Sequence, residues 1–547
     1  MKKCYTTLIL LFFVKLISAQ MGEWTWMNGD STINSFGHFG TQGVFHQLNS
    51  PPAFYEACEW TDKEGNFWLF GGVSPLYEYG DLWKFNPDIN QWAWINGTGL
   101  PAQPPVYGTQ GIPSPTNSPG SRGWGVPTWV DTSGNLWLFG GYAGDCFADL
   151  WKYDIATNEW AWMKGPANFS TLHHYGTMGV ADPANFPWRK TETNITWTDN
   201  NNNLWVFGGG IGGSSFNNDL WKYNIGTNEW AWMKGDTLFN QQSVYGIKGV
   251  SDSANKPSAR CCYAKWKDSD GNFYFFGGND GNGNPSLNAS FNDLWRYSLN
   301  TNEWTWISGD STVNDSISNS TQCISTTDDP PPARFENRAC WTIGCDLENF
   351  IFYGGIHRSF GNACYGDLWD YNYVTNEWTL MDGSYIPNQF PSYGIKTVSS
   401  PLNHPGSRLG AIGWKDKKCN LWLFGGGGSL GKLNDLWRFA PDTACPHFCN
   451  LCKPAVGIIE VPISQINLLV FPNPANSYLD ISCELFSKQN IELCIYNLLG
   501  EEIFSSKEEP TQGKYGRKIN IQRLSDGVYF LLLKTNGEIV AKKFVKQ

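Results

Sequence analysis

The feature of this sequence that most limits its fold is a long internal repeat. Residues 149–165 read DLWKYDIATNEWAWMKG, and residues 219–235 read DLWKYNIGTNEWAWMKG, about 70 residues further along the chain. An apolar segment that ends in Gly-Gly precedes the DLW motif in six places. Its copies are NFWLFGG at 66–72, NLWLFGG at 135–141, NLWVFGG at 203–209, NFYFFGG at 272–278, NFIFYGG at 349–355 and NLWLFGG at 420–426. A repeat of this kind predicts one structural unit that packs against copies of itself.

Each repeat unit is predicted to contain four short β-strands. Bulky apolar residues alternate with polar ones in stretches such as LWKY and EWAWM, without the spacing of a helix. Asp, Asn and Gly occupy the intervening turns, for example DTSGN at 131–135 and IATN at 155–158, where they favour tight hairpins. Four antiparallel strands in each of six units predict an all-β fold, a six-bladed β-propeller.

The sixth repeat is incomplete. The chain reads DLWRFAPDTACPHFC at 435–449 and has no EWxW segment there, whereas EWTWMN stands alone at 23–28. We therefore predict that residues 23–28 form the outer strand of the sixth blade. This arrangement would join the two ends of the propeller and remove an open sheet edge.

The double glycine, the aromatic strand after it and the Trp of the fourth strand resemble kelch repeats over residues 22–441. The resemblance implies a kelch-type propeller whose blades each have strands a to d, counted outward from the axis. In such blades the a–b and c–d turns share one face. The b–c and d–a connections share the other, here called the loop face. Because the long connections fall on the loop face and binding residues gather on loops held by a rigid scaffold, we expect the function there.

The chain begins with the features of a secretory signal peptide. Lys2 and Lys3 precede an apolar run, and small residues follow at Ser18 and Ala19. The apolar run is too short to span a membrane as a helix. The net charge of −11 argues against nucleic acid as a partner. The predicted division of the chain is a signal peptide at 1–19, a propeller at 20–443, a Cys-containing linker at 444–466 and a C-terminal domain at 467–547.

The C-terminal domain shows alternating strand and turn signals typical of a small Ig-like β-sandwich. Four of its segments resemble the C-terminal sorting domain of type IX secretion cargo in Bacteroidetes. They are Pro472-Asn473-Pro474, the IYNLLG stretch at 495–500, a segment with Gly527 and Tyr529, and Lys542-Lys543 before Phe544. The resemblance implies the type IX secretion machinery as a partner and a secreted or outer-surface location.

Two sets of side chains are candidates for ligand binding. The first is an arginine at the start of strand a, which would suit carboxylates or sugar acids at the channel entrance. Its alternative role is structural, bonding to loop carbonyls. The set comprises Arg122, Arg189, Arg260, Arg334 and Arg408, with Phe54 in blade one. The second set is aromatic and also recurs with the scaffold; it comprises Tyr107, Trp124, Tyr175, Trp188, Tyr245 and Tyr393.

Metal and disulfide sites have weaker support in the sequence. His38, His357 and His404 map to the loop face and are weak candidates for a copper or zinc site. They have no fixed spacing, so no metal or cofactor is predicted. Disulfides are permitted after export, and the expected pairs are Cys323 with Cys364 and Cys345 with Cys419. The linker cysteines at 445, 449 and 452 favour disulfides over zinc.

These features favour a secreted or cell-surface binding or adhesion protein that recognises a glycan or protein through the loop face. No Ser-His-Asp order, nucleophile elbow or phosphate-binding loop indicates catalysis. Because propeller active sites assemble from many loops, an extracellular carbohydrate-active enzyme, a kelch-type oxidase, epimerase or lyase, is one alternative. A structural surface component is another.

Overall fold

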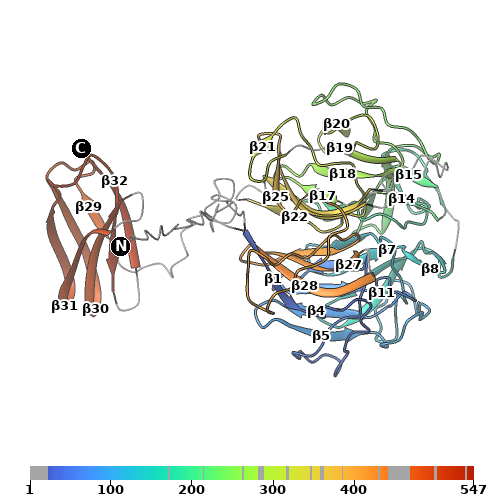
Figure 1. Ribbon diagram of the computed structural model, residues 1–547, viewed down its shortest axis with the longest axis horizontal. Helices are drawn as coiled ribbons and strands as arrows, with labels where there is room; N and C mark the ends of the chain where they lie inside the picture. Colours follow the sequence, from blue (N-terminus) through green and yellow to red (C-terminus); the bar gives the residue numbers. More distant parts are fainter. Residues whose placement is uncertain are drawn as a thin grey trace, which may run out of the picture. The chain divides into compact units, whose positions relative to one another are not determined.

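The computed structural model divides into two compact units, one ending at residue 453 and the other beginning at residue 454 (Figure 1). The signal peptide predicted at 1–19 and the linker predicted at 444–466 lie outside the residues that the structure describes. The described residues are 22–169, 173–212, 215–261, 264–280, 289–315, 320–344, 348–357, 363–384, 386–428, 431–441, 468–497, 502–535 and 539–547.

All regular elements of the described residues are β-strands, as the sequence predicts. Six antiparallel sheets make up the first unit. Blade one has β2 (Cys58–Thr61), β3 (Phe67–Phe70), β4 (Leu82–Asn86) and β5 (Gln91–Asn96). Blade two has β6 (Thr128–Val130), β7 (Leu136–Phe139), β10 (Leu150–Asp154) and β11 (Glu159–Lys164), with the small hairpin β8 (Tyr142–Ala143) and β9 (Asp145–Cys146) beside it. Blade three has β13 (Thr196–Thr198), β14 (Asn203–Gly210), β15 (Phe216–Asn224) and β16 (Glu229–Lys234).

The other three sheets repeat this order. Blade four has β17 (Ala264–Lys267), β18 (Phe273–Asp280), β19 (Ala289–Ser298) and β20 (Glu303–Ser308). Blade five has β22 (Cys340–Ile343), β23 (Asn349–His357), β24 (Ala363–Asn372) and β25 (Glu377–Asp382). Blade six has β26 (Ile412–Lys415), β27 (Leu421–Gly428), β28 (Gly431–Pro441) and β1 (Gly22–Asn28). In the part of the chain that the structure describes, no helix is long and apolar enough to cross a membrane.

The first strands of the blades surround a central channel. β6 lies between β2 and β13, β17 lies between β13 and β22, and β26 lies between β22 and β2. A tryptophan on these strands ties one blade to the next, because its indole nitrogen donates to a carbonyl of the following blade. The bonds run from Trp60 to Trp137, from Trp129 to Trp205, from Trp197 to Trp266, from Trp266 to Ile351 and from Trp341 to Trp414, at 2.8–3.2 Å.

The N-terminal strand belongs to blade six. β1 pairs antiparallel with β28, with Trp24 opposite Phe439 and Trp26 opposite Trp437. Trp24 is 2% exposed and packs in a core cluster with residues of blades five and six. The segment that the sixth repeat lacks is therefore supplied from the other end of the propeller chain, in the position that the sequence predicts.

Each d–a connection covers the outer edge of the blade that follows it. In blade three β12 (Ala181–Asp182) pairs with β16, and in blade five β21 (Ser325–Thr326) pairs with β25. Asn185 fixes the first of these segments, because its Nδ2 donates to the carbonyl of Trp230 at 3.0 Å. Equivalent bonds come from Asn49, Asn117, Asn255 and Asn403. The connections thus extend along the rim and protect sheet edges, instead of lying wholly on the loop face as the sequence indicated.

The second unit has five strands that hydrogen bonds link into one continuous sheet, and these strands enclose a hydrophobic core of their own. Its strands are β29 (Leu469–Phe471), β30 (Tyr478–Asn497), β31 (Glu502–Asn520), β32 (Gly527–Lys534) and β33 (Ile539–Lys546). The order is β29-β30-β32-β33, and β31 also pairs with β30. Leu493, Leu531 and Phe544 are buried in the core of this unit.

Candidate functional site

Four of the five predicted arginines are buried and paired with aspartate. Arg122 donates from Nη1 to Oδ1 of Asp149 at 2.8 Å and from Nη2 to Oδ2 at 3.1 Å. Arg260, Arg334 and Arg408 form the same two bonds with Asp293, Asp367 and Asp435. These guanidinium side chains are 0% exposed. They connect strand a to the DLW motif of their own blade and do not line the channel entrance.

Blade three differs from the prediction in which residue holds this position. Lys190, not Arg189, forms the buried ion pair with Asp219, at 2.5 Å. Arg189 instead pairs with the half-exposed Asp145 at 2.9 Å and donates to the carbonyl of Ile211. The sequence alignment was therefore displaced by one residue in this blade. A strand residue displaced by one position faces the opposite side of its sheet.

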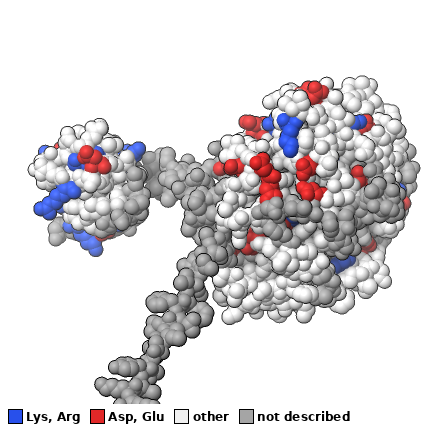
Figure 2. Space-filling view, turned by 45° about the horizontal axis from the view of Figure 1, so that its top comes forward, with Lys and Arg blue, Asp and Glu red and all other residues white. Residues whose placement is uncertain are grey.

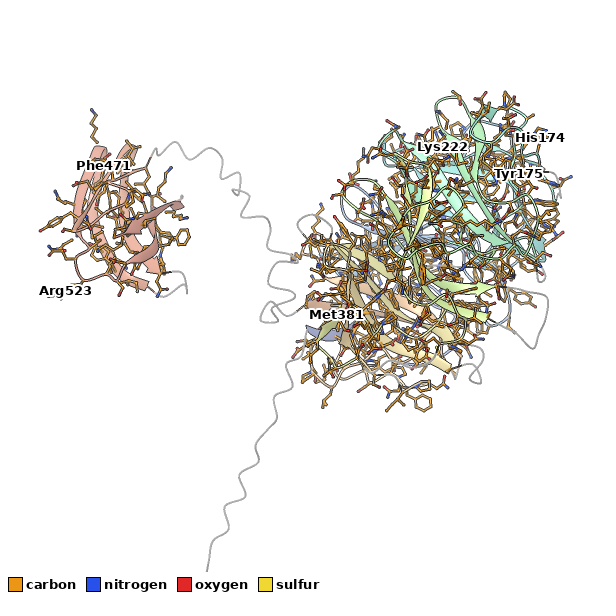
Figure 3. All side chains as sticks on the ribbon, turned by 90° about the horizontal axis from the view of Figure 1, so that it is seen from above. His174, Tyr175, Lys222, Met381, Phe471 and Arg523 are labelled. Carbon is orange, nitrogen blue, oxygen red and sulfur yellow. The ribbon has the colours of Figure 1, made fainter. Side chains whose placement is uncertain are left out.

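The predicted tyrosines bond to the same aspartates. The hydroxyl of Tyr107 donates to Oδ2 of Asp149 at 2.9 Å, and its ring packs against Trp151. Tyr175, Tyr245 and Tyr393 do the same with Asp219, Asp293 and Asp435. Figure 3 shows Tyr175 and its neighbour His174 near the periphery of the propeller. Burial raises the pKa of all four tyrosines, and the nearby aspartates raise it further. They stabilise the blades and lie away from the channel.

The two predicted tryptophans occupy different places. Trp188 stacks on His173 with ring centroids 3.5 Å apart and packs against Phe239. Trp124 lines a hollow in the loop face beside the channel, described below. Of the aromatic candidates, Trp124 is therefore the one that lines this hollow.

The three candidate histidines do not come together. His38 is an exposed residue of the first d–a connection, whereas His357 is fully buried in β23. His404 lies 4.0 Å from Asp382, and burial lowers its pKa. Among the described residues, one group of His, Cys, Asp and Glu side chains has the geometry to hold a metal ion, and it contains no histidine.

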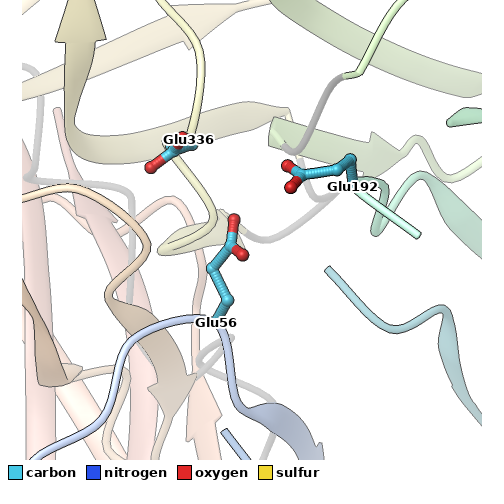
Figure 4. Close-up of side chains that lie close together, drawn as sticks. All are labelled: Glu56, Glu192 and Glu336. Atoms are coloured by element: carbon cyan, nitrogen blue, oxygen red, sulfur yellow. The ribbon is translucent and has the colours of Figure 1, made fainter. Parts of the chain in front are cut away.

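That group consists of Glu56, Glu192 and Glu336, which the sequence analysis did not identify. One carboxylate oxygen from each lies within 4.8 Å of the others (Figure 4). They come from the starts of strand a in blades one, three and five, and Glu56 is 1% exposed. Figure 4 shows the three side chains pointing toward one another. We call this group the glutamate triad.

The sequence does contain a pattern that marks the glutamate triad. Each glutamate stands two residues after the position of the buried cation, in the segments Phe54-Tyr55-Glu56, Lys190-Thr191-Glu192 and Arg334-Phe335-Glu336. The signal was missed because it occurs only in alternate blades, and because the alignment of blade three was displaced.

The backbone at this position has an unusual conformation in every described blade. The φ angles of Glu56, Glu192 and Glu336 are 54°, 56° and 56°. Trp124 in blade two and Gly410 in blade six have φ angles of 63° and 58°. Glycine adopts this left-handed region freely, whereas other residues do so at a cost. Because the conformation recurs in every described blade, it belongs to the turn before strand a, and the presence of glutamate in three of these turns is the feature that differs between blades.

A hollow of about 280 Å³ adjoins the glutamate triad. It is lined by Trp124, Tyr142, Thr191, Glu192, Gly210 and Gly212. The indole of Trp124 donates to Oε1 of Glu78 at 3.0 Å and its ring meets that of Tyr55 edge to face, which fixes its orientation. The channel mouth, defined here as the glutamate triad together with this hollow, therefore combines carboxylates with an aromatic wall.

Two cations of the described residues lie near the channel mouth, Lys432 and Arg189; Arg189 donates to the carbonyl of Ile211, next to Gly212 of the hollow. The ammonium group of Lys432 sits 4.4 Å from the ring centroid of Tyr55 and donates to the carbonyl of Ser74. Burial lowers the pKa of Lys432 to about 8, while Glu78 and Glu56 act in the opposite direction. Acidic side chains are also more frequent than basic ones on the face of this unit turned to the viewer in Figure 2. The three carboxylates of the glutamate triad therefore favour a positively charged or hydroxyl-rich ligand.

Comparison with known protein families agrees with both parts of this architecture. A kelch motif matches residues 257–311, which contain the four strands of blade four. A secretion system C-terminal sorting domain matches residues 469–547, which contain β29 to β33. The chain is a kelch-repeat protein with a type IX sorting tail. No curated protein matches the chain of this kelch-repeat protein. The tail supports secretion or an outer-surface location and interaction with the secretion machinery.

The sorting motif of this kelch-repeat protein organises the end of the tail. Asn473, between Pro472 and Pro474, donates from Nδ2 to the carbonyl of Lys543 and accepts from the amide of Val545, at 3.1 and 2.9 Å. The hydroxyl of Tyr529 donates to the carbonyl of Ser525. Gly527 begins β32, while Lys542 and Lys543 are exposed on β33. The side chain of Asn473 thus holds the last strand.

The predicted disulfides have different outcomes. Cys364 is a free cysteine buried in β24, so the predicted bond to Cys323 is not formed. Cys345 lies outside the described residues, so its pairing with Cys419 stays a prediction. The linker cysteines likewise lie outside the described residues.

Proposed function

We propose that this kelch-repeat protein is an exported binding protein and that the channel mouth is its recognition site for a protein or glycan. Kelch repeats are consistent with a protein-binding propeller, and the tail with secretion. The site proposed here differs from the predicted arginines and tyrosines, because those side chains hold the blades together. The channel mouth is instead formed where three carboxylates and the ring of Trp124 come together at the starts of strand a.

The observation that carries this proposal is the convergence of Glu56, Glu192 and Glu336. Three carboxylates held close together repel one another. Each also occupies a backbone conformation that glycine would adopt without strain, as Gly410 does in blade six. Glutamate at these three positions therefore carries an electrostatic cost and a conformational cost, and such a combination is typical of a functional site.

The chemistry of the channel mouth suits two classes of group. Lys and Arg side chains of a protein partner would pair with the carboxylates and lie against the rings of Trp124 and Tyr142. Sugar hydroxyls would donate to the same carboxylates, with a sugar face packed on Trp124. Both fit the hollow, which is wide enough for one such group and opens beside the glutamate triad.

The test compares Glu192→Gln and Trp124→Ala with the unmodified full chain on a glycan array and on an array of basic and acidic peptides. The matched control is Glu64→Gln, which removes one exposed carboxylate from the a–b turn of blade one on the opposite face. We expect both channel-mouth variants to weaken binding by about tenfold or more, and the control to leave it unchanged. Equal binding by all four proteins would refute the proposal.

A second candidate function has one specific observation in its favour. The oxygens of the glutamate triad lie within 4.8 Å of one another, and the paired carboxyl groups of retaining glycosidases stand about 5 Å apart. The carbohydrate-active alternative therefore has two acidic groups at a suitable separation. Release of reducing sugar from a bound glycan, abolished by Glu56→Gln with binding retained, would establish this alternative over simple recognition.

A further inference from the structure

A second cavity, of about 410 Å³, lies along the channel between the first strands of the blades. It involves β2, β6, β13, β17, β22 and β26, and its lining runs to residues that adjoin the a–b turns, such as Thr61 and Lys267. We call it the channel cavity. The glutamate triad stands at the other end of strand a, so the channel cavity and the channel mouth are different sites.

The channel cavity has an excess of positive charge. Lys265, Lys267 and Arg338 line it, and Glu59 is the one acidic side chain among the described residues of its lining. Two more cations than anions therefore face this space, in a chain whose net charge is −11. Such an excess in a confined, poorly solvated space concentrates anions.

The single carboxylate of the channel cavity is already engaged. Oε2 of Glu59 accepts from Nη2 of Arg338 at 2.7 Å, and Oε1 accepts from Nδ2 of Asn194 at 2.5 Å. Arg338 is 1% exposed, so its guanidinium is held in place. Glu59 therefore forms its ion pair with Arg338 and acts on Lys265 only through the Coulombic interaction that raises the pKa of that lysine.

The two lysines bond to neutral oxygens. Lys265 donates from Nζ to Oδ1 of Asn194 at 3.1 Å and to the hydroxyl of Thr196. Lys267 donates to the carbonyl of Thr198 at 3.0 Å. Within the described residues, neither ammonium group forms an ion pair with a carboxylate. Burial lowers the pKa of Lys265 to about 8 and also lowers that of Lys267, which indicates that both charges lack full compensation.

Two more distant carboxylates are committed to turns. Asp199 and Asp268 raise the pKa of Lys267. Asp199 accepts from the amide of Asn203 at 2.9 Å and from the indole of Trp205 at 2.8 Å. Asp268 accepts from the amide of Asn272 at 2.8 Å. Each therefore serves the hairpin that it begins and does not neutralise the centre of the channel cavity.

We propose that the channel cavity binds a small solute through a carboxylate or phosphate group held by Lys265 and Lys267, with Arg338 beside them. Oxyanions accept charge-assisted hydrogen bonds from both ammonium groups, and the remaining wall combines threonines of β2, β6 and β13 with the tryptophans Trp60, Trp129, Trp197 and Trp414. The cavity volume falls within the range of small-molecule sites and admits a sugar acid. This inference goes beyond the proposed function, because it concerns a different end of the channel and a different charge.

The experiment is isothermal titration of the full chain with glucuronate, with inorganic phosphate and with glucose. We expect glucuronate or phosphate to bind and glucose, which lacks the anionic group, to bind much more weakly. Binding of glucuronate alone identifies a sugar acid, and binding of phosphate identifies a phosphate group. Equal affinity for glucose and glucuronate, or no binding of either anion, overturns the proposal.

Substitutions that remove a positive or a negative charge from the channel cavity test the proposal further. Lys265→Gln removes one ligand charge and should weaken anion binding by about ten- to a hundredfold. Lys265→Arg retains the charge and should retain binding. Glu59→Gln removes the opposing carboxylate and should strengthen binding at pH 6, where Lys265 stays protonated although Glu59 no longer raises its pKa; a misfolded cavity would not give this outcome. Lys152→Gln is the matched control, because Lys152 lies on β10 and does not line the cavity. If Glu59→Gln and Lys265→Gln shift affinity in the same direction, the assignment is wrong.

The test of anion binding in the channel cavity does not depend on whether the channel mouth binds a ligand. Glu192→Gln should leave anion affinity unchanged, and Lys265→Gln should leave binding on the glycan and peptide arrays unchanged. Failure at one end of the channel therefore does not carry over to the other.

Discussion

Asp81 offers the clearest test of how the repeated ion pair stabilises the propeller. Five blades place a buried cation beside the aspartate of the DLW motif, whereas blade one has Phe54 at that position. Asp81 is 1% exposed, and its Oδ2 has no hydrogen-bond partner. Its Oδ1 accepts from the amide of Gly99 at 2.7 Å and the indole of Trp94 at 3.2 Å. Burial raises the pKa of Asp81 to about 6, despite these two bonds.

The raised pKa of Asp81 gives the size of the expected change in stability. The usual pKa of an aspartate is 3.8, and the difference corresponds to about 3 kcal/mol of destabilisation when the group is ionised. Asp81→Asn removes the charge and keeps the Oδ1 acceptor, but it buries an amide that lacks a partner, which costs about 1 kcal/mol. We therefore expect a net stabilisation of about 2 kcal/mol at pH 7.5. For a propeller of about 420 residues this raises the unfolding midpoint by about 2 °C.

The pH dependence has a definite sign. Between pH 4 and 6 the folded protein holds more protons at Asp81 than the unfolded chain does, so its stability falls as the pH rises through this window. The advantage of Asp81→Asn should therefore vanish near pH 4.5, where the ionisation penalty of about 1 kcal/mol equals the cost of the amide, and be complete above pH 7. Thermal unfolding of the full chain at pH 4.5, 6 and 7.5 measures it.

A matched substitution in blade two should have the opposite effect. Asp149→Asn leaves Arg122 buried without its counter-charge, which costs about 3–5 kcal/mol, and it should lower the unfolding midpoint by about 4 °C. If Asp81→Asn and Asp149→Asn both destabilise at pH 7.5, or if the effect of Asp81→Asn does not grow with pH, the reasoning is refuted.

Three further predictions concern the contacts that hold the blades. Deleting residues 22–28 removes the outer strand of blade six and should lower the unfolding midpoint of the propeller by several degrees; an unchanged midpoint would contradict this role. Asn185→Ala leaves two backbone carbonyls without a donor and should cost about 2 kcal/mol, whereas the exposed control Asn201→Ala should cost almost nothing in the same denaturant titration. Trp129→Phe removes the indole donor to the carbonyl of Trp205 and should cost about 1 kcal/mol, measured as a lower unfolding midpoint.

Much of the fold follows from local patterns in the chain. Alternation in LWKY and EWAWM, together with Asp, Asn and Gly turns, specifies the strands and hairpins, because side chains alternate between the faces of a strand. The unpaired EWTWMN segment also identified the partner of β28, since a strand without a neighbour leaves its backbone groups exposed. The pattern did not show that the d–a connections would return to cover the rim. Whether a d–a connection reaches the outer strand of the next blade depends on how far apart the two blades lie, which the local pattern does not specify.

The roles of side chains were harder to assign than their positions. Arginine and tyrosine recur in the sequence as a ligand site would, yet both converge on the aspartate of the DLW motif. Repetition in nearly every blade is a property of a scaffold contact, because every blade packs strand a against the same DLW motif. The glutamate triad and the lysines of the channel cavity occur in only some blades, and a search for repeated motifs passes over them.

The sequence by itself determined the strands, the repeat, the strand that completes blade six and the sorting tail, because each depends on residues close together or on a pattern that recurs. Only the tertiary structure decided which side chains meet in the channel. Glu56, Glu192 and Glu336 are far apart in the chain, and they approach within 4.8 Å because three alternate blades direct the same position toward one axis. Lys265 and Glu59 face the same cavity for the same reason, and neither has a sequence neighbour that indicates it.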